Sequence, residues 1–330
     1  MKIGLVLGAG GTVGLAYHAG VLKALHDVAG FTPDDADVIV GTSAGAVAAA
    51  YVRTGWTPDE LYQVALGTHA SVDGLSMEEL DGRSRAILER RFEDPFTLIR
   101  RAIGSAYVAG RSFVRVPAPM LRAPAVLQRA FPGGLFANAE GKRRFAEELP
   151  VGWPERDLWL CTYDIHRGRR VVLGRPSRRP TKGPLASLQQ AVLASCAIPG
   201  VYPPTQVGSL TLVDGGVWST TNLDLAAKAG CDLIIGVAPM AYDTVGPLPN
   251  PLMQLVRRVP ARMLVNEMAD ARERGAEVLL IRPSAGELRI HGSNLMRRAG
   301  WERVARAAYE STCDLLQTER FQPLLAAKAA

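Results

Sequence analysis

Short apolar runs that stop at glycine alternate with stretches of helical spacing along much of this chain. Residues 2–7 form an apolar run, and the apolar positions of residues 14–28 then recur every three to four residues. A second apolar run at 37–40 also ends at a glycine and precedes a stretch of small residues at 44–53. The runs predict buried strands and the periodic stretches predict helices. This alternation predicts an α/β fold with a mostly parallel sheet.

The same alternation of predicted strands and helices continues in the second half of the chain. Further strands are predicted at residues 158–165, 170–173, 210–213, 233–237 and 278–281. Further helices are predicted at residues 185–196, 222–229 and 295–316. These elements extend the α/β alternation almost to the end of the chain.

Residues 57–154 follow a different pattern, because this stretch is helical in spacing, rich in arginine and interrupted by prolines. We expect a helical cap inserted into the α/β core. Basic and apolar side chains alternate here: Arg100, Arg101, Arg111, Arg115 and Arg122 lie among Phe96, Leu98, Ile99, Phe113, Val114 and Leu121. Such mixing suits a surface that meets anionic lipid. The same pattern also suits a helical subdomain whose apolar side chains pack on the sheet.

The composition is that of an ordinary globular protein, with 48% hydrophobic and 21% charged residues. The formal net charge is +6. A basic surface is either simply solvated or attracts an anionic partner. No nucleic-acid-binding signature accompanies the charge, so lipid head groups are the better anionic partner and no nucleic acid is expected. The oligomeric state is left open.

Several features bear on the compartment and on cofactors. The first apolar run is too short for a signal peptide, and no run of about 18 apolar residues predicts a membrane span. Four cysteines without a CxxC pair favour a reduced, cytoplasmic protein, which could associate peripherally with membranes. No His/Cys cluster and no Asp-rich calcium loop occurs, so no metal and no cofactor is expected.

The sequence Gly41-Thr42-Ser43-Ala44-Gly45 is a G-x-S-x-G motif between a predicted strand and a predicted helix. A nucleophile elbow requires this context, because the turn is so tight that the residues flanking the serine must be small. The serine then lies at a helix N-terminus, where the backbone N–H groups favour negative charge. The motif predicts Ser43 as a nucleophile.

A glycine-rich loop runs from Gly8 to Gly14 after the first predicted strand. A dinucleotide site would need a third glycine at the position of Val13 and an acidic residue after the second strand, and both are missing. The other readings are a turn made for packing and an oxyanion hole. Loops after neighbouring parallel strands meet at one edge of a sheet, so this loop and Ser43 are expected to face the same point.

Asp214 ends a predicted strand and is followed by Gly215 and Gly216. An Asp-Gly pair is common in ordinary turns. The same placement at the carboxyl edge of a sheet also suits a catalytic carboxylate, and the residues alone leave both readings open.

Together these motifs resemble the patatin-like phospholipase family, in which a glycine-rich loop, a G-x-S-x-G and a distant D-G-[GA] follow in this order. Residues 194–204 are similar to the proline-containing segment of that family, and Asn222 resembles its asparagine after D-G-G. The resemblance covers roughly residues 2–240. It implies a three-layer α/β/α sandwich that forms a single domain over residues 1–330. This domain would have a core at 2–240, a cap at about 57–154 and an extension at about 241–330.

The resemblance implies a lipid acyl hydrolase of the phospholipase A, lysophospholipase or esterase type that works through a Ser–Asp dyad. Ser43 would attack the ester and form an acyl-enzyme, and Asp214 would take the serine proton. The oxyanion would be held by the backbone N–H groups of Gly10, Gly11 and Thr12. The motif glycines would support these turns: Gly8, Gly14, Gly41, Gly45, Gly215 and Gly216.

Two residues depart from the family pattern, because Val13 stands where a basic residue is usual and Ala9 where a glycine is usual. Both changes keep the backbone N–H donors, but the positive charge at position 13 is lost. Three other functions remain open. They are an α/β-hydrolase with a triad of Ser43, Asp214 and His291, a non-catalytic lipid-binding protein on the same fold, and a nucleotide-binding regulator.

Overall fold

The computed structural model describes residues 1–69, 95–113, 133–136, 139–175, 186–241 and 251–321. The chain divides into two compact units. Unit 1 comprises Met1–Asp81, Pro154–Leu158 and Ser219–Ala330, and unit 2 comprises Gly82–Trp153 and Trp159–Trp218.

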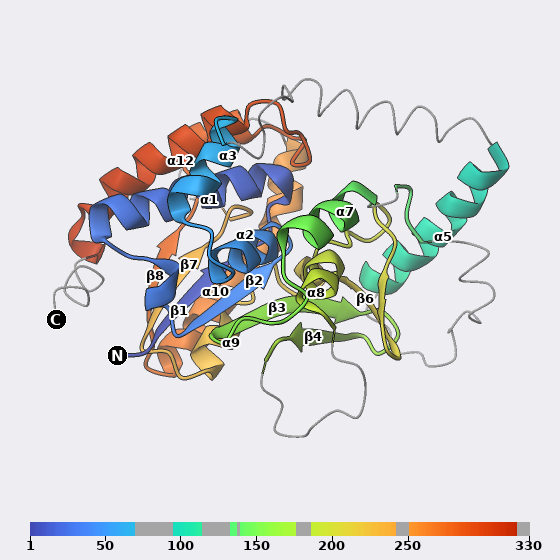
Figure 1. Cartoon of the computed structure of the whole chain (residues 1–330), viewed down its shortest axis with the longest axis horizontal. Helices are drawn as coiled ribbons and strands as arrows, with labels where there is room; N and C mark the ends of the chain where they lie inside the picture. Colours follow the sequence, from blue (N-terminus) through green and yellow to red (C-terminus); the bar gives the residue numbers. More distant parts are fainter. Residues whose placement is uncertain (70–94, 114–132, 137–138, 176–185, 242–250, 322–330) are drawn as a thin grey trace. The chain divides into compact units, whose positions relative to one another are not determined.

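Helices and strands alternate along the chain, and Figure 1 shows them in sequence colours. The strands are β1 (Ile3–Leu7), β2 (Val38–Thr42), β3 (Asp157–Asp164), β4 (Arg169–Leu173), β5 (Thr205–Val207), β6 (Leu210–Asp214), β7 (Leu233–Val237) and β8 (Glu277–Ile281). The α-helices are α1 (Gly11–Ala29), α2 (Ala44–Arg53), α3 (Pro58–Leu66), α5 (Pro95–Phe113), α7 (Ala139–Glu148), α8 (Leu188–Ser195), α9 (Asp224–Lys228), α10 (Pro251–Glu273), α11 (Ala285–His291) and α12 (Trp301–Leu316). Short 3-10 helices are η1 (Pro33–Asp35), η4 (Gly215–Val217) and η5 (Glu319–Phe321).

The strands of unit 1 pair in the order β2-β1-β7-β8, and every pair is parallel. Leu7 at the end of β1 lies opposite Gly41 of β2 and Val237 of β7. The carboxyl ends of these three strands therefore share one edge of the sheet. The glycine-rich loop and the G-x-S-x-G turn both begin at that edge.

Helices cover both faces of this parallel sheet (Figure 1). On one face α1 packs against α2, α3 and α12, and α2 also contacts β1 and β2. On the other face α9 contacts β1 and β2, and α10 packs on α9 and β8. Gly4 of β1 allows α9 to approach, because a Cβ at this position would lie 2.9 Å from the Cβ of Ala226. Unit 1 thus has the three layers of an α/β/α sandwich.

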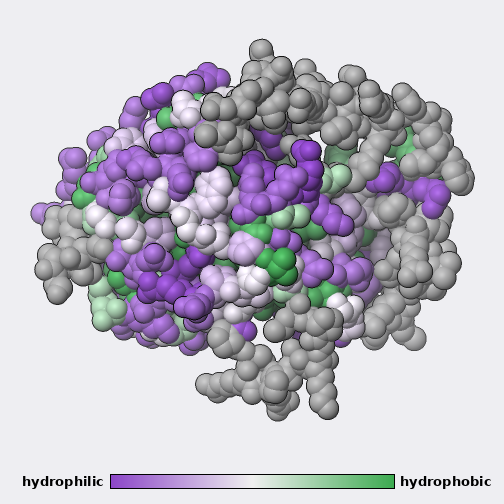
Figure 2. Space-filling view, in the orientation of Figure 1, coloured by the Kyte–Doolittle hydropathy of each residue, from purple (hydrophilic) through white to green (hydrophobic). Residues whose placement is uncertain are grey.

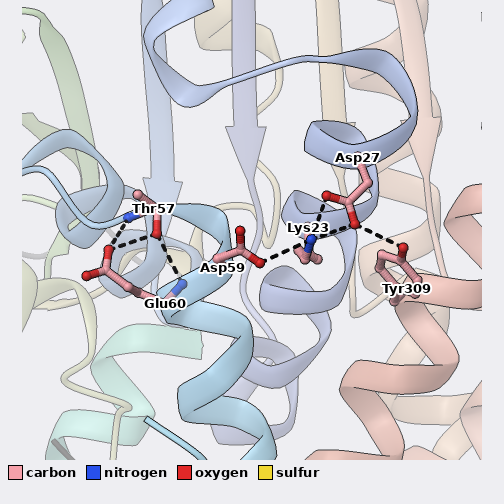
Figure 3. Close-up of polar contacts among 6 residues, drawn as sticks. All are labelled: Lys23, Asp27, Thr57, Asp59, Glu60 and Tyr309. Atoms are coloured by element: carbon pink, nitrogen blue, oxygen red, sulfur yellow. Dashed lines mark hydrogen bonds and ion pairs between the residues drawn. The ribbon is translucent and has the colours of Figure 1, made fainter. Parts of the chain in front are cut away.

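Polar side chains join the outer helices α1, α3 and α12 (Figure 3). Lys23 of α1 forms ion pairs with Asp27 of the same helix and, at 3.1 Å, with Asp59 of α3. The hydroxyl of Tyr309 in α12 donates to Asp27 at 3.0 Å. The surface over α1 and α12 is mostly hydrophilic in Figure 2, as expected for the outer face of amphipathic helices. These contacts fix α3 as part of unit 1.

The strand pairs within unit 2 are antiparallel: β6 pairs with β3 and β5, and β4 pairs with β3. A short turn connects β3 to β4, which allows only antiparallel pairing. Helix α5 packs here through Val108, which lies in an apolar cluster with Tyr163, Ile165 and Val213.

The mixed α/β fold class is confirmed, and each predicted strand lies within two residues of an observed one. The helix predicted to begin at residue 295 begins instead at Trp301, because Gly300 adopts a left-handed backbone with φ 84°. Of the helices in the range predicted as a cap, α3 belongs to unit 1, whereas α5 and α7 belong to unit 2. The long helix α10 was not predicted.

Candidate active site

Ser43 occupies a sharp turn between β2 and α2. Its backbone has φ 55° and ψ −118°, a conformation that residues other than glycine rarely adopt, and its carbonyl accepts from the N–H groups of Ala46 and Val47. The residue is 5% exposed and forms the N-cap of α2. This is the backbone strain expected of a nucleophile elbow, and it places Ser43 next to a helix N-terminus.

Glycine is required on steric grounds at both glycine positions of the G-x-S-x-G motif. A Cβ on Gly45 would lie 2.0 Å from the carbonyl oxygen of Leu7, at the end of β1. A Cβ on Gly41 would lie 2.7 Å from the Cα of Ala46 in the first turn of α2. The G-x-S-x-G pattern therefore follows from how closely α2 approaches β1 and β2.

The glycine-rich loop lies at the N-terminus of α1 and is just as crowded. A Cβ on Gly10 would lie 2.6 Å from the Cα of Gly14, and one on Gly11, where φ is 62°, would lie 2.5 Å from the carbonyl oxygen of Leu295. A Cβ on Gly14 would lie 3.6 Å from the Cβ of Ala44 in α2. Unit 1 thus brings the glycine-rich loop beside the elbow, as the sequence predicts.

The first turn of α1 offers backbone donors. The N–H of Gly14 donates to Gly10, and the N–H of Val13 donates to Leu295 at 3.1 Å. Within the described residues, no acceptor is found for the backbone N–H groups of Gly10, Gly11 and Thr12. The N–H groups of a first helical turn have no partner inside the helix, so they are suited to bind an anion.

The structure also gives a role to the two residues after Gly11. The Thr12 hydroxyl donates to the carbonyl of Arg297 at 2.9 Å, so the Thr12 side chain fastens α1 to the segment before α12. Val13 is 1% exposed. A buried apolar side chain at position 13 fits an interior position, where a solitary charge would be costly.

His18 of α1 holds the beginning of the glycine-rich loop. Its Nε2 lies 2.7 Å from the carbonyl oxygen of Gly8, and since a carbonyl can only accept, Nε2 carries the proton. The ring is fully buried, and burial lowers its pKa to about 4. His18 is therefore a neutral hydrogen-bond donor at physiological pH.

Asn222 connects the loop before α9 to the elbow. Its side-chain nitrogen Nδ2 donates to the Thr42 hydroxyl at 3.0 Å and to the carbonyl of Ser219 at 2.7 Å. Its backbone has φ 56°, which asparagine tolerates better than most residues. The motif asparagine is therefore bonded to the residue directly before Ser43.

Asp214 is the last residue of β6 in unit 2 and is 6% exposed. Its backbone N–H donates to Ala197 at 3.0 Å, and its carboxylate oxygen Oδ1 accepts from the N–H of Gly216 at 2.7 Å. A Cβ on Gly215 would lie 2.4 Å from the carbonyl oxygen of Cys161 in β3. The D-G-G turn thus holds one carboxylate oxygen in place by a backbone donor.

Asp214 is buried close to the Cys196 thiol. Burial and, second, the negative charge of Asp214 raise the pKa of the Cys196 thiol well above its ordinary value. The D-G-G turn in unit 2 therefore combines an oriented carboxylate with burial.

His291 is buried at the end of α11 in unit 1. Its ring packs edge to face against Tyr17 of α1, with 5.5 Å between ring centroids. Aromatic packing of this kind stabilises a core.

Within the described ranges, no group of three or more His, Cys, Asp and Glu side chains could hold a metal ion. Of the helices that the structure describes, none is long and apolar enough to cross a bilayer.

Comparison with known proteins gives a family and several similar chains. A family model described as patatin-like phospholipase matches residues 5–227. The uncharacterized protein YqhO of Bacillus subtilis strain 168 is 28% identical over 264 residues, which cover 76% of this chain and 75% of YqhO.

Two solved structures are also similar. VipD from Legionella pneumophila aligns over 99% of this chain with a TM-score of 0.41 and 15% identity. The type III effector protein ExoU aligns over 98% with a TM-score of 0.39 and 16% identity. The alignments span 66% of the VipD chain and 53% of the ExoU chain.

Proposed function

Because this chain belongs to the patatin-like phospholipase family, we propose that it is a lipid acyl hydrolase with Ser43 as its nucleophile and Asp214 as its base. The observation that carries the proposal is the backbone of Ser43, with φ 55° at the N-terminus of α2. Strained backbone of this kind persists where the surrounding structure enforces it, and it is concentrated at active sites. Both Ser43 and Asp214 lie within the residues that the family model matches.

The proposed reaction has two halves. The Ser43 hydroxyl oxygen attacks the ester carbonyl carbon, its proton passes to the Asp214 carboxylate, and the tetrahedral intermediate collapses to an acyl-enzyme. The leaving alkoxide takes the proton from Asp214. Water then attacks the acyl-enzyme, Asp214 accepts a proton from that water, and the proton returns to Ser43 as the fatty acid leaves.

In this proposal the oxyanion is held by the first turn of α1. The backbone N–H groups of Gly10, Gly11 and Thr12 have no acceptor among the described residues, and Gly14 lies close to Ala44 of α2. Donors that are fixed before the reaction stabilise the developing charge without reorganisation. A single missing donor of this kind costs roughly 100- to 1,000-fold in kcat.

The proposed substrates are phospholipids or lysophospholipids, and a membrane surface is their source. We propose that α5 meets an anionic membrane, because Ile99 and Ile103, one turn apart on it, are 57% and 53% exposed. Two of the predicted lipid-facing arginines have another role. Arg101 donates to the carbonyl of Gly134 and Arg111 to that of Ile165, so both fasten α5 to unit 2.

Ile99 and Ile103 therefore carry the proposed membrane contact, and Arg100, next to Ile99, remains a predicted head-group contact. Of the other residues predicted to meet lipid, Leu98 is half-buried. Val114, Arg115, Leu121 and Arg122 lie outside the described residues, as do the side chains of Phe96 and Phe113.

Vesicle co-sedimentation tests this contact. Changing both Ile99 and Ile103 to serine should lower binding to anionic vesicles and leave turnover of a soluble short-chain ester unchanged, because the membrane contact is separate from the chemistry. Arg100→Glu should weaken binding further at low salt, where one basic residue contributes about 1 kcal/mol. Equal, negligible binding of the unaltered protein to anionic and neutral vesicles would contradict the proposal.

The hydrolase itself is tested by labelling with a fluorophosphonate probe, followed by peptide mapping. The proposal expects the label on Ser43, in EDTA as well as in its absence. Label on another serine, or no label on a folded protein, would overturn the assignment. Restoration of lost activity by calcium or zinc after EDTA would contradict the metal-free mechanism.

A further inference from the structure

The segment Ser219–Leu223, which we call the brace, contacts both motif loops of unit 1. Asn222 of the brace donates to the Thr42 hydroxyl at 3.0 Å, directly before the nucleophile. The carbonyl of Thr220 accepts from the N–H of Ala9 at 2.7 Å, directly before Gly10. The brace therefore joins the two turns whose relative position sets the distance between Ser43 and the oxyanion donors.

The brace has little regular structure of its own. It lies between η4 and α9, and Asn222 within it has a left-handed backbone. Its internal contacts converge on the Ser219 hydroxyl oxygen, which accepts from the N–H groups of Thr221 at 3.2 Å and Asn222 at 3.0 Å. A short irregular segment of this kind needs an outside partner to stay in one conformation.

Glu267 of α10 provides that partner. Its carboxylate oxygen Oε2 accepts from the Thr221 hydroxyl at 2.6 Å and from the N–H of Leu223 at 3.0 Å. Glu267 is half-buried, and burial raises the pKa of its carboxyl. No sequence motif marks Glu267, and its role follows only from its contacts.

We propose that Glu267 is a positioning residue for hydrolysis, which acts by fixing the brace and, through it, the elbow and the oxyanion loop. The inference rests on the proposed function. Glu267 touches neither substrate nor Ser43 in this role. It acts through Thr221 and Leu223 on Asn222 and Thr220.

The proposal predicts that loss of Glu267 lowers kcat and leaves KM nearly unchanged. Without Glu267 the Thr221 hydroxyl and the Leu223 N–H lose their acceptor, and the brace shifts. A displacement of about 1 Å between reacting groups costs on the order of 100-fold in rate. Substrate binding by distant surfaces is unaffected, so the loss falls on kcat.

The test compares four variants on a p-nitrophenyl acyl ester. Glu267→Leu removes the oxygen that accepts both bonds and should lower kcat by about 10- to 100-fold, with KM within about twofold. Glu267→Gln keeps one oxygen that can accept both bonds and should restore most of kcat. Thr221→Val removes one bond and should lie between these two. Glu273→Gln, an exposed carboxyl on the same helix, is the matched control and should equal the unaltered protein.

Hydrogen exchange gives a readout that does not depend on activity. In Glu267→Leu the amides of Ala9 and Leu223 should exchange faster, while those of β7 should not change. Faster exchange together with no labelling of Ser43 in the unaltered protein would support the brace and refute the hydrolase. A folded Glu267→Leu with unchanged kcat and unchanged exchange overturns the inference. If that variant does not fold, an unchanged kcat in Thr221→Val overturns it.

Discussion

The turns that carry Ser43 and Asp214 both follow a β-strand and both contain glycines, but their backbones differ. Ser43 has φ 55° and ψ −118°, whereas Asp214 has φ −48° and ψ 130°, which any residue adopts. A nucleophile must project from its turn, and a strained backbone achieves this. The proposed base, Asp214, needs only a fixed orientation and shielding from water, which the Gly216 N–H and burial provide. One turn stores strain and the other does not.

The largest effect is expected when the strained turn loses its hydroxyl. Ser43→Ala should reduce hydrolysis of a p-nitrophenyl ester by at least about 1,000-fold, because no other group can form the acyl-enzyme. The fold should be retained, which circular dichroism and the melting temperature would check. A well-folded variant with near-normal activity would remove Ser43 from the mechanism.

The unstrained turn should be almost as sensitive to a change of charge. Asp214→Asn should lower kcat by about 1,000-fold or more, because an amide cannot take the serine proton. Its oxygen can still accept from Gly216, so stability should change little. His291→Phe keeps an aromatic ring against Tyr17 and should leave kcat within about threefold. The reverse result, with His291 essential and Asp214 dispensable, would favour the triad.

Adding a methyl group at a glycine of either turn should lower the free energy of unfolding. Gly45→Ala and Gly215→Ala place a Cβ 2.0 and 2.4 Å from carbonyl oxygens, so each should lower the free energy of unfolding by about 3 kcal/mol or more. Gly110→Ala, in open space on α5, is the matched control and should raise stability by about 0.5–1 kcal/mol. Chemical denaturation measures all three, and unchanged midpoints for the first two variants would show that the turns are not sterically closed.

The smallest expected effect is a pH dependence of stability, and it comes from His18, which holds the glycine-rich loop beside the Ser43 turn. The pKa of His18 is lowered from 6.5 to about 4, so the unfolded chain binds a proton between these values while the folded chain does not. Stability should therefore fall by about 3 kcal/mol as the pH drops from 6.5 to 4, and then level off. His18→Gln, which can still donate to Gly8 but does not titrate, should lack this part of the pH dependence in urea unfolding.

The strand and turn pattern was predictable because it depends on local sequence. Leu7, Gly41 and Val237 end apolar runs that stop at the same sheet edge, and the structure places them side by side. The motif predicts that positions 41 and 45 must be small. The steric cause is seen only in the structure, where α2 lies close to Leu7.

The supporting residues could not be predicted, because their partners are distant in sequence. Glu267 bonds to Thr221, 46 positions away, and Thr12 bonds to the carbonyl of Arg297, 285 positions away. The arginines of α5 are a similar case. Helical spacing could not show that Arg101 and Arg111 bind backbone carbonyls while Ile99 and Ile103 remain exposed.

Because Ser43 has a positive φ, selection for heat resistance and selection for ester cleavage should favour different residues at this position. Glycine adopts this backbone without strain, and holding another residue there costs on the order of 1–3 kcal/mol. Ser43→Gly should therefore make the chain more heat-resistant while removing the proposed nucleophile. A library screened only for survival at high temperature would therefore become enriched in glycine at position 43. A library screened for ester cleavage would retain serine there and accumulate compensating changes elsewhere. The residue at position 43 would then report which of the two pressures a population had experienced.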